Sequence, residues 1–243
     1  MQPKERLIFP LDVADSDAAR RLVALLQEEV GLFKIGYELL LATGRAFVEE
    51  LAQTLPGGYF LDLKLHDIPA TMKGALRGLL SGVRFITVHV DQGQKVLESL
   101  VNSLKGEVEV LGVTVLTSLG GQELLALGID PRLAVDPPVE LVVKRAGLAR
   151  EAGCRGVVCA GTEAKAVKEA WGEDFLVVCP GIRPAWAPVP GDDQKRVVTA
   201  YEAIRAGADY VVVGRPIRTA ADPREAARRV VEEIARGLAD RSR

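Results

Sequence analysis

Short runs of aliphatic and β-branched residues alternate along the chain with longer stretches in which apolar residues recur every three or four positions. The short runs predict buried strands, and the longer stretches predict amphipathic helices. The predicted strands cover residues 6–12, 32–36, 59–64, 85–90, 108–115, 156–160, 175–179 and 210–214. The predicted helices cover residues 16–29, 38–54, 70–81, 93–103, 137–151, 162–170, 196–206 and 223–237.

This alternation favours an α/β fold in which eight strand–helix units form a parallel sheet closed into a (β/α)8 TIM barrel. An open, doubly wound sheet is the alternative, but the glycine-rich dinucleotide fingerprint does not follow the first strand. Of the 243 residues, 48% are hydrophobic and only 5% are aromatic, which is typical of aliphatic strands covered by helices. We expect a single barrel domain over residues 1–243, with residues 237–243 as a frayed tail.

The charge balance and the rare residue types exclude several classes of function. The net charge of −2 gives no basic excess for nucleic acid or an anionic membrane, and no apolar run is long enough to span a membrane. The first residues lead straight into a strand rather than a signal peptide, so we expect a cytoplasmic protein. His66 and His89 are the two histidines, and Cys154, Cys159 and Cys179 lack metal-type spacing. We therefore expect no metal site and interpret Cys159 and Cys179, near the ends of apolar strands, as small buried hydrophobic residues.

The third predicted strand carries an alternating carboxylate and ammonium, Asp62 and Lys64, and Asp67 follows just beyond its end. Side chains two residues apart on a strand point to the same side, so Asp62 and Lys64 share one face. By spacing, Asp67 is expected to be a local partner of Lys64. Taken alone, this alternation is typical of a strand with one face in water.

Charged residues on the neighbouring strands change this interpretation. Asp12 ends the first predicted strand and Lys34 lies on the second. In a barrel, functional residues gather at the carboxyl ends of adjacent strands, which lie about 4.8 Å apart. Charges buried there are costly unless they pair. The sequence therefore predicts a cluster of alternating charge, either a functional site or a structural set of ion pairs.

The later strands end in residues that fit a polar, phosphorylated ligand. Thr117 and Ser118 follow the fifth strand and offer hydroxyl groups. A long connection without regular pattern, 181–194, follows the seventh strand and is typical of a lid. Gly214 and Arg215 follow the eighth strand, where barrels commonly bind phosphate. Each motif alone is typical of an ordinary turn or loop, but together they predict a pocket.

With these residues identified, the chain resembles orotidine 5′-phosphate decarboxylases of the bacterial type along essentially its whole length. The most specific motifs are DLKLHDIPAT at 62–71, PGIRP at 180–184, DDQKR at 192–196 and GADYVVVGRPI at 207–217. Looser matches are LDVAD at 11–15 and FKIGYELL at 33–40. The chain departs from the usual pattern at Ala70, where the family usually has Asn, and at Ala200, where it usually has Pro. Neither departure affects a charged position of the motifs.

The resemblance implies decarboxylation of orotidine 5′-monophosphate to uridine 5′-monophosphate, the last step of pyrimidine nucleotide synthesis, by a homodimer without metal or organic cofactor. It implies that Lys64 donates a proton to C6 of the pyrimidine and that Lys34, Asp62 and Asp67 complete the charged network. Asp67 and Thr71 would come from the partner subunit. The other implied roles are ribose binding by Asp12 and Lys34, pyrimidine binding by Thr117 or Ser118, and phosphate binding by Arg183, Gln194, Gly214 and Arg215. Pro180 is also expected to bind the substrate.

Two other functions remain open from the residues. A magnesium-dependent decarboxylase or aldolase acting on sugar phosphates would reuse the carboxylates of an Asp-x-Lys-x-x-Asp motif as metal ligands. A non-catalytic phosphate-binding barrel would account for Gly214 and Arg215 but would leave the charges on the third strand without a role. Sensitivity of the activity to a chelator distinguishes the metal-dependent enzyme from the cofactor-free one.

Overall fold

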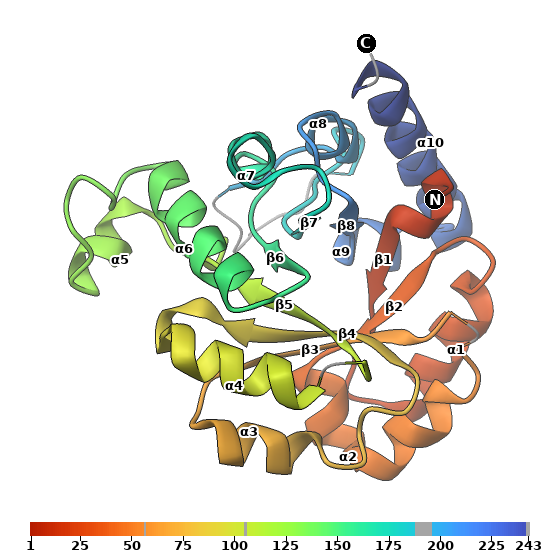
Figure 1. Cartoon of the computed structure of the whole chain (residues 1–243). Coiled ribbons are helices and arrows are strands. Elements are labelled where there is room, and N and C mark those ends of the chain that lie inside the picture. The colour runs from red at the N-terminus through yellow and green to blue at the C-terminus, as the bar shows by residue number, and fades with distance from the viewer. Residues whose placement is uncertain (56, 105, 188–195, 242–243) are drawn as a thin grey trace.

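Eight parallel strands close into a barrel in which each strand pairs with the next and β8 pairs with β1 (Figure 1). The computed structural model describes residues 1–55, 57–104, 106–187 and 196–241. The strands are β1 (Leu7–Pro10), β2 (Leu32–Ile35), β3 (Tyr59–Leu65), β4 (Val83–His89), β5 (Glu109–Val113), β6 (Gly156–Val158), β7 (Leu176–Cys179) and β8 (Tyr210–Val212). All eight predicted strands and the predicted barrel are confirmed.

Helices surround the barrel (Figure 1). They are α1 (Ser16–Leu26), α2 (Tyr37–Ala52), α3 (Pro69–Leu76), α4 (Gln94–Leu104), α5 (Gly121–Ala126), α6 (Val139–Glu151), α7 (Ala164–Trp171), α8 (Ala200–Arg205), α9 (Arg215–Arg218) and α10 (Pro223–Arg241). Two short 3-10 helices, η1 (Pro3–Arg6) and η2 (Val90–Gln92), precede β1 and follow β4.

Several boundaries differ from the predicted ones. Helix α8 begins at Ala200 rather than at residue 196, because Thr199 caps it in a capping box with Glu202. The short helices α5 and α9 were not predicted, since neither is long enough to show a helical period. Helix α10 continues to Arg241, so residues 237–241 are helical rather than a frayed tail. Gly237 lets α10 pack closely against α8, because a Cβ there would lie 2.8 Å from the carbonyl oxygen of Tyr201.

The core has two layers. The barrel interior is filled by side chains that point inward from the strands: Ile8, Leu32, Phe60, Phe85, Leu111, Val113, Val158, Val178, Tyr210 and Val212. The larger layer lies between the strands and the helices and is rich in Leu, Val, Ile and Ala. Strand residues therefore alternate between the two layers, and both faces of the sheet are buried. This explains why the strands read as nearly continuous apolar runs.

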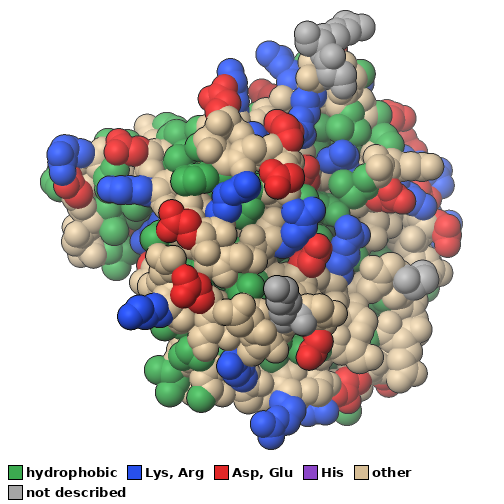
Figure 2. All heavy atoms as spheres, in the orientation of Figure 1, with side chains coloured by type: hydrophobic (Ala, Val, Ile, Leu, Met, Phe, Trp, Pro, Cys, Tyr) green, Lys and Arg blue, Asp and Glu red, His purple; other side chains and the backbone are tan. Residues whose placement is uncertain are grey.

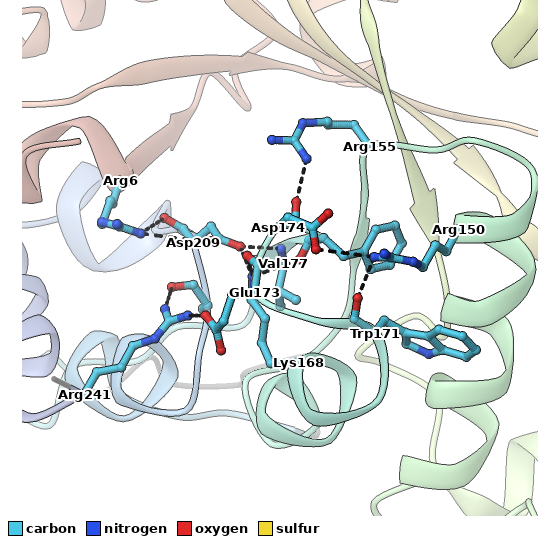
Figure 3. Close-up of polar contacts among 12 residues, drawn as sticks. Arg6, Arg150, Arg155, Lys168, Trp171, Glu173, Asp174, Val177, Asp209 and Arg241 are labelled. Carbon is cyan, nitrogen blue, oxygen red and sulfur yellow. Dashed lines mark hydrogen bonds and ion pairs between the residues drawn. The ribbon is translucent and has the colours of Figure 1, made fainter. Parts of the chain in front are cut away.

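A charged cluster lies at the amino ends of the strands (Figure 3). Lys168 on α7 donates to Asp209 Oδ2 at 2.7 Å, and Arg6 donates to the carbonyl oxygen of Asp209 at 3.0 Å. The backbone N–H of Val177 donates to Asp209 Oδ2, the oxygen that Lys168 also contacts, at 2.8 Å. We call Arg6, Lys168 and Asp209 the amino-end cluster. It connects α7, β7 and β8 to the start of the chain.

The described part of the chain contains no helix long and apolar enough to cross a membrane. Over the face seen in Figure 2, acidic and basic side chains are interspersed.

Candidate active site

A cavity of about 280 Å3 opens at the carboxyl ends of the strands. Ten of the predicted site residues line it: Asp12, Lys34, Asp62, Lys64, Thr117, Ser118, Pro180, Arg183, Gly214 and Arg215. They come from segments far apart in the sequence, which closure of the barrel brings together. The charged residues lie on or just after β1, β2 and β3. Residues on or after β5, β6, β7 and β8 line the other side of the cavity.

Asp12, Lys34, Asp62 and Lys64 form what we call the carboxyl-end cluster. The Lys64 ammonium donates to Asp62 Oδ2 at 2.8 Å, and Lys34 Nζ lies 3.4 Å from the same oxygen. Lys34 also donates to Asp12 Oδ1 at 3.2 Å. The predicted alternation of charge is therefore present, with one carboxylate oxygen shared between two ammonium groups.

The cluster favours the charged forms of Asp62 and Lys34. Burial opposes ionisation of Asp62, but attraction to Lys34 and Lys64 and hydrogen bonds from Lys64 and Thr87 outweigh it and lower the Asp62 pKa below its ordinary value. Burial likewise disfavours the charged form of Lys34. Attraction to Asp62 and Asp12 nevertheless raises the Lys34 pKa above its ordinary value. A buried carboxylate and a buried ammonium thus stabilise each other.

An irregularity in β3 brings Asp62 and Lys64 together. Leu61 pairs with Ile86 and Leu65 pairs with Val88, so three residues of β3 lie opposite the single residue between them on β4. Lys64 has a φ of 43°, in the left-handed region that residues with a side chain rarely adopt. Such bulges commonly redirect a side chain at an active site. The sequence predicted a regular strand, and this bulge was not foreseen.

The other part of the lining contains the residues predicted to bind pyrimidine and phosphate. Thr117 is buried and Ser118 is exposed, and both line the cavity. The backbone N–H of Arg183 donates to the carbonyl oxygen of Val198 at 2.9 Å, which fixes the segment after β7. Gly214 passes so close to β1 that a Cβ would lie 2.8 Å from Pro10 Cγ. Only glycine allows this approach without a shift of the backbone.

Two predicted residues, Asp67 and Thr71, are not brought into this cavity. Asp67 and Thr71 are exposed on the segment from β3 into α3, and neither is among the described residues that line the cavity. Asp67 Oδ1 accepts a hydrogen bond from the backbone N–H of Ile68 at 2.6 Å, rather than an ion pair from Lys64. The local Asp67–Lys64 contact expected from spacing is therefore wrong. Gln194 lies outside the described residues.

The structure adds three residues to which the sequence assigned no role. Thr87 on β4 donates to Asp62 Oδ1 at 2.8 Å. Arg218 lines the cavity and donates to the carbonyl oxygen of Asp12. Arg196 is buried against Glu163 at 2.8 Å and donates to the carbonyl oxygen of Leu116 at 2.8 Å, just before Thr117. A threonine in a β-branched strand and an arginine in a loop carry no distinctive signal.

Cys159 and Cys179 are buried, as predicted, and Cys154 is buried too. Burial raises the pKa of the Cys154 thiol to about 12. A hydrogen bond with Cys179 and burial raise the pKa of the Cys159 thiol well above its ordinary value. Within residues 1–55, 57–104, 106–187 and 196–241, no group of three or more His, Cys, Asp or Glu side chains is arranged to hold a metal ion.

Known proteins resemble this chain over almost its full length. An orotidine 5′-phosphate decarboxylase of Methylobacterium sp. strain 4-46 is 46% identical over 238 residues, which cover 97% of this chain and 98% of that protein. The enzyme of that name from Desulfosudis oleivorans is 42% identical over 238 residues, 97% of this chain and 95% of that protein. The crystal structure of orotidine 5′-phosphate decarboxylase from Lactobacillus acidophilus superposes with a TM-score of 0.77 at 32% identity, covering 94% of this chain and 98% of that one. A family model matches residues 5–230. The chain therefore belongs to the orotidine 5′-phosphate decarboxylase / HUMPS family.

Proposed function

We propose that this protein decarboxylates orotidine 5′-monophosphate to uridine 5′-monophosphate and CO2, the last step of pyrimidine nucleotide synthesis, without metal or organic cofactor. Membership of the family supports this function. The observation that carries it is the Lys64 ammonium, held 2.8 Å from Asp62 and facing the cavity. Decarboxylation at C6 needs such an ammonium, because the resulting carbanion has no adjacent carbonyl group to delocalise it.

Lys64 has two tasks in the proposed mechanism. As the bond from C6 to the carboxylate carbon breaks, its electron pair stays on C6 and CO2 leaves. The fixed ammonium stabilises this developing negative charge and then donates a proton to C6. Lys64 is left neutral and regains its proton from water. Asp62 holds the ammonium in place, and its charge beside the substrate carboxylate raises the energy of the bound ground state.

The rest of the cavity binds the nucleotide. Asp12 and Lys34, 3.2 Å apart, face the ribose hydroxyl groups, and Thr117 or Ser118 contacts the pyrimidine. The phosphate is assigned to Arg183, Gly214 and Arg215, which line the cavity, together with Gln194. Pro180 lines the cavity as a further substrate contact. The phosphate is remote from the breaking bond, yet its binding energy lowers the barrier if it holds the reactive groups together.

The proposed active unit is a homodimer. Tyr37 and Leu41 on α2 and Ile68 before α3 are large exposed hydrophobic residues, and Ile68 lies beside Asp67. A two-fold interface over this surface would bury them and carry Asp67 and Thr71 into the partner's cavity. The exposed position of Asp67 supports this arrangement, because its carboxylate is outside its own subunit's cavity.

Turnover tests the function directly. Purified protein mixed with orotidine 5′-monophosphate should release CO2 and change the ultraviolet absorbance to that of uridine 5′-monophosphate, equally with and without EDTA. Activity that is lost in EDTA and restored by Mg2+ would instead support the metal-dependent alternative. No conversion under either condition would refute the proposed function.

A mixing experiment tests the dimer. Lys64→Ala and Asp67→Ala should each be inactive as homodimers. When equal amounts are mixed and exchanged, half of the dimers are hybrids with one intact site, so about a quarter of wild-type activity should return. If Asp67 acted within its own subunit, every site would lack one residue and no activity would return.

A further inference from the structure

Thr87 is a buried polar residue near the carboxyl end of β4. It lies on β4 two residues after Phe85, whose side chain belongs to the inner apolar layer, and its side chain is 0% exposed. Burying a hydroxyl group is costly unless it forms hydrogen bonds. The partners of Thr87 are both in the carboxyl-end segment of β3. This single hydroxyl therefore contacts the part of the chain that carries the proposed chemistry.

The chemistry of the two partners fixes the direction of both hydrogen bonds. The backbone N–H of Lys64 can only donate, so Thr87 Oγ1 accepts from it, at 2.8 Å. The one hydroxyl proton then goes to Asp62 Oδ1, also at 2.8 Å. Asp62 must be the acceptor in this arrangement, which favours its ionised form. One hydroxyl thus joins the backbone of Lys64 to the carboxylate of Asp62.

The hydrogen bonds of Thr87 lie at the bulge in β3. Thr87 is the single β4 residue opposite the three bulged residues of β3, between the pairs Leu61–Ile86 and Leu65–Val88. A bulge interrupts the backbone hydrogen bonds between strands. The Thr87 hydroxyl supplies an acceptor for the Lys64 N–H at this interruption. It also offsets part of the strain of the left-handed Lys64 backbone.

The same hydroxyl orients the carboxylate. With Oδ1 of Asp62 held by Thr87, the other oxygen, Oδ2, is directed to both Lys64 at 2.8 Å and Lys34 at 3.4 Å. Rotation of the carboxylate would break the contact with Thr87 and misplace the ammonium group of Lys64. Displacement of a reacting group by about 1 Å can cost on the order of 100-fold in rate.

We propose that Thr87 is a positioning residue for the Asp62–Lys64 pair: its hydroxyl sets both the orientation of the carboxylate and the backbone conformation that presents the ammonium. This inference rests on the proposed function. It assigns Thr87 no contact with substrate. Loss of the hydroxyl should therefore lower kcat much more than it weakens binding of the nucleotide, whose phosphate is held by residues after β7 and β8.

Serine and alanine at position 87 provide the matched pair, because they differ only in the hydroxyl group. Thr87→Ser should keep kcat within about threefold of wild type, whereas Thr87→Ala should lose about 100-fold, as expected for a misplaced reacting group. Thr87→Val, which keeps the shape but not the hydroxyl, should behave like Thr87→Ala. The dissociation constant of uridine 5′-monophosphate should change by no more than about threefold in all three.

Thr114→Val is the control for loss of a buried hydroxyl. Thr114 follows β5, is 1% exposed and donates to the carbonyl oxygen of Val158 at 2.9 Å, which is not a group of the carboxyl-end cluster. This variant should lose stability comparable to that lost by Thr87→Val while keeping kcat. A second measurement is the fall of kcat at low pH, the acid limb of the pH profile. Removing the hydroxyl raises the Asp62 pKa, so the limb should move to higher pH in Thr87→Ala and stay in place in Thr87→Ser.

Equal kcat values for Thr87→Ser and Thr87→Ala would overturn the inference, as would an acid limb that does not move. An equal loss of kcat in Thr114→Val would also overturn it, by showing a general effect of lost stability. The wild-type protein is assayed beside the variants. Absence of wild-type turnover contradicts the proposed function, whereas wild-type turnover with an unaffected Thr87→Ala contradicts only the role of Thr87.

Discussion

Two Lys–Asp pairs of nearly equal length lie at opposite ends of the barrel. In the carboxyl-end cluster, Lys64 Nζ lies 2.8 Å from Asp62 Oδ2. In the amino-end cluster, Lys168 Nζ lies 2.7 Å from Asp209 Oδ2 (Figure 3). The Lys64 side chain is 33% exposed, whereas the Lys168 side chain is 3% exposed. The two pairs have the same chemistry, so their surroundings must determine what each pair does.

The hydrogens of the two ammonium groups have different partners. Lys168 donates to Asp209 and to the carbonyl oxygens of Glu173 and Phe175, at 2.9 and 2.8 Å, which uses all three of its N–H groups. Lys64 faces the cavity and shares its carboxylate with Lys34. An ammonium saturated by fixed acceptors stabilises the fold. An ammonium at a cavity, held by one carboxylate, can act on a ligand.

The largest expected effect is the loss of activity in Lys64→Ala. Removing both the proton donor and the charge at C6 should lower kcat/KM by at least about 10,000-fold. Stability should change little, because Asp62 keeps Lys34 at 3.4 Å and Thr87 at 2.8 Å. Steady-state kinetics and urea unfolding measure the two quantities. Lys165→Ala, which removes an exposed lysine on α7, is the control and should change neither. Near-normal turnover by Lys64→Ala would refute the assigned role.

The second largest effect is expected for Lys168→Met at the amino end, which should lose stability and keep activity. Methionine fills the space but leaves the Asp209 carboxylate with Val177 N–H and a more distant Arg6, 3.9 Å away. Breaking one partner of a buried ion pair should lower the free energy of unfolding by about 3–5 kcal/mol. The folded enzyme should keep kcat/KM within about twofold, because sites at opposite ends act independently.

Urea unfolding and kinetics on the same preparation check this prediction. Lys165→Met makes the same substitution on the exposed side of α7 and should cost little stability. If Lys168→Met lost activity without losing stability, the division of the barrel into a stabilising end and a reactive end would be wrong.

The sequence predicted the elements that follow from periodicity and from barrel closure. The eight strands were recognisable as apolar runs, and closure then required Asp12, Lys34 and Asp62 to meet. The β3 bulge was not predictable, because a left-handed backbone at Lys64 leaves no trace in the hydrophobic pattern. Thr87 was missed for a related reason. Its neighbours are apolar and β-branched, so it resembles a residue chosen for strand propensity.

The amino-end cluster was also not predicted from the sequence. Lys168 lies in a helix and Asp209 lies just before a strand, and such residues are usually exposed. Their pairing depends on how α7 packs over β7 and β8, which periodicity does not specify. Long-range pairing can be predicted where the fold forces residues together at strand ends, and not where a side chain reaches across from a helix.

The smallest predicted effect is the acid sensitivity contributed by Asp62. Burial opposes its ionisation, but Lys34 and Lys64 and the hydrogen bonds from Lys64 and Thr87 lower its pKa below the ordinary value of 3.8. A carboxyl group with a lowered folded-state pKa stabilises the protein above its unfolded pKa. That contribution is lost as the pH falls through the folded pKa. Between the unfolded and the folded pKa of Asp62, the free energy of unfolding of the wild type should therefore fall by up to about 1.4 kcal/mol per pH unit.

Asn at position 62 cannot titrate, so Asp62→Asn should lack this part of the loss of stability at low pH. Chemical unfolding at a series of pH values should show the stability difference between wild type and Asp62→Asn shrinking as the pH falls below about 4. Lys34→Met should move the loss to higher pH, since Lys34 is the strongest attraction acting on Asp62. Lys165→Met should leave it in place. A difference that stayed constant with pH would mean that the two ammonium groups do not hold Asp62 ionised. The carboxyl-end cluster would then lack the mutual stabilisation that separates it from an ordinary buried ion pair.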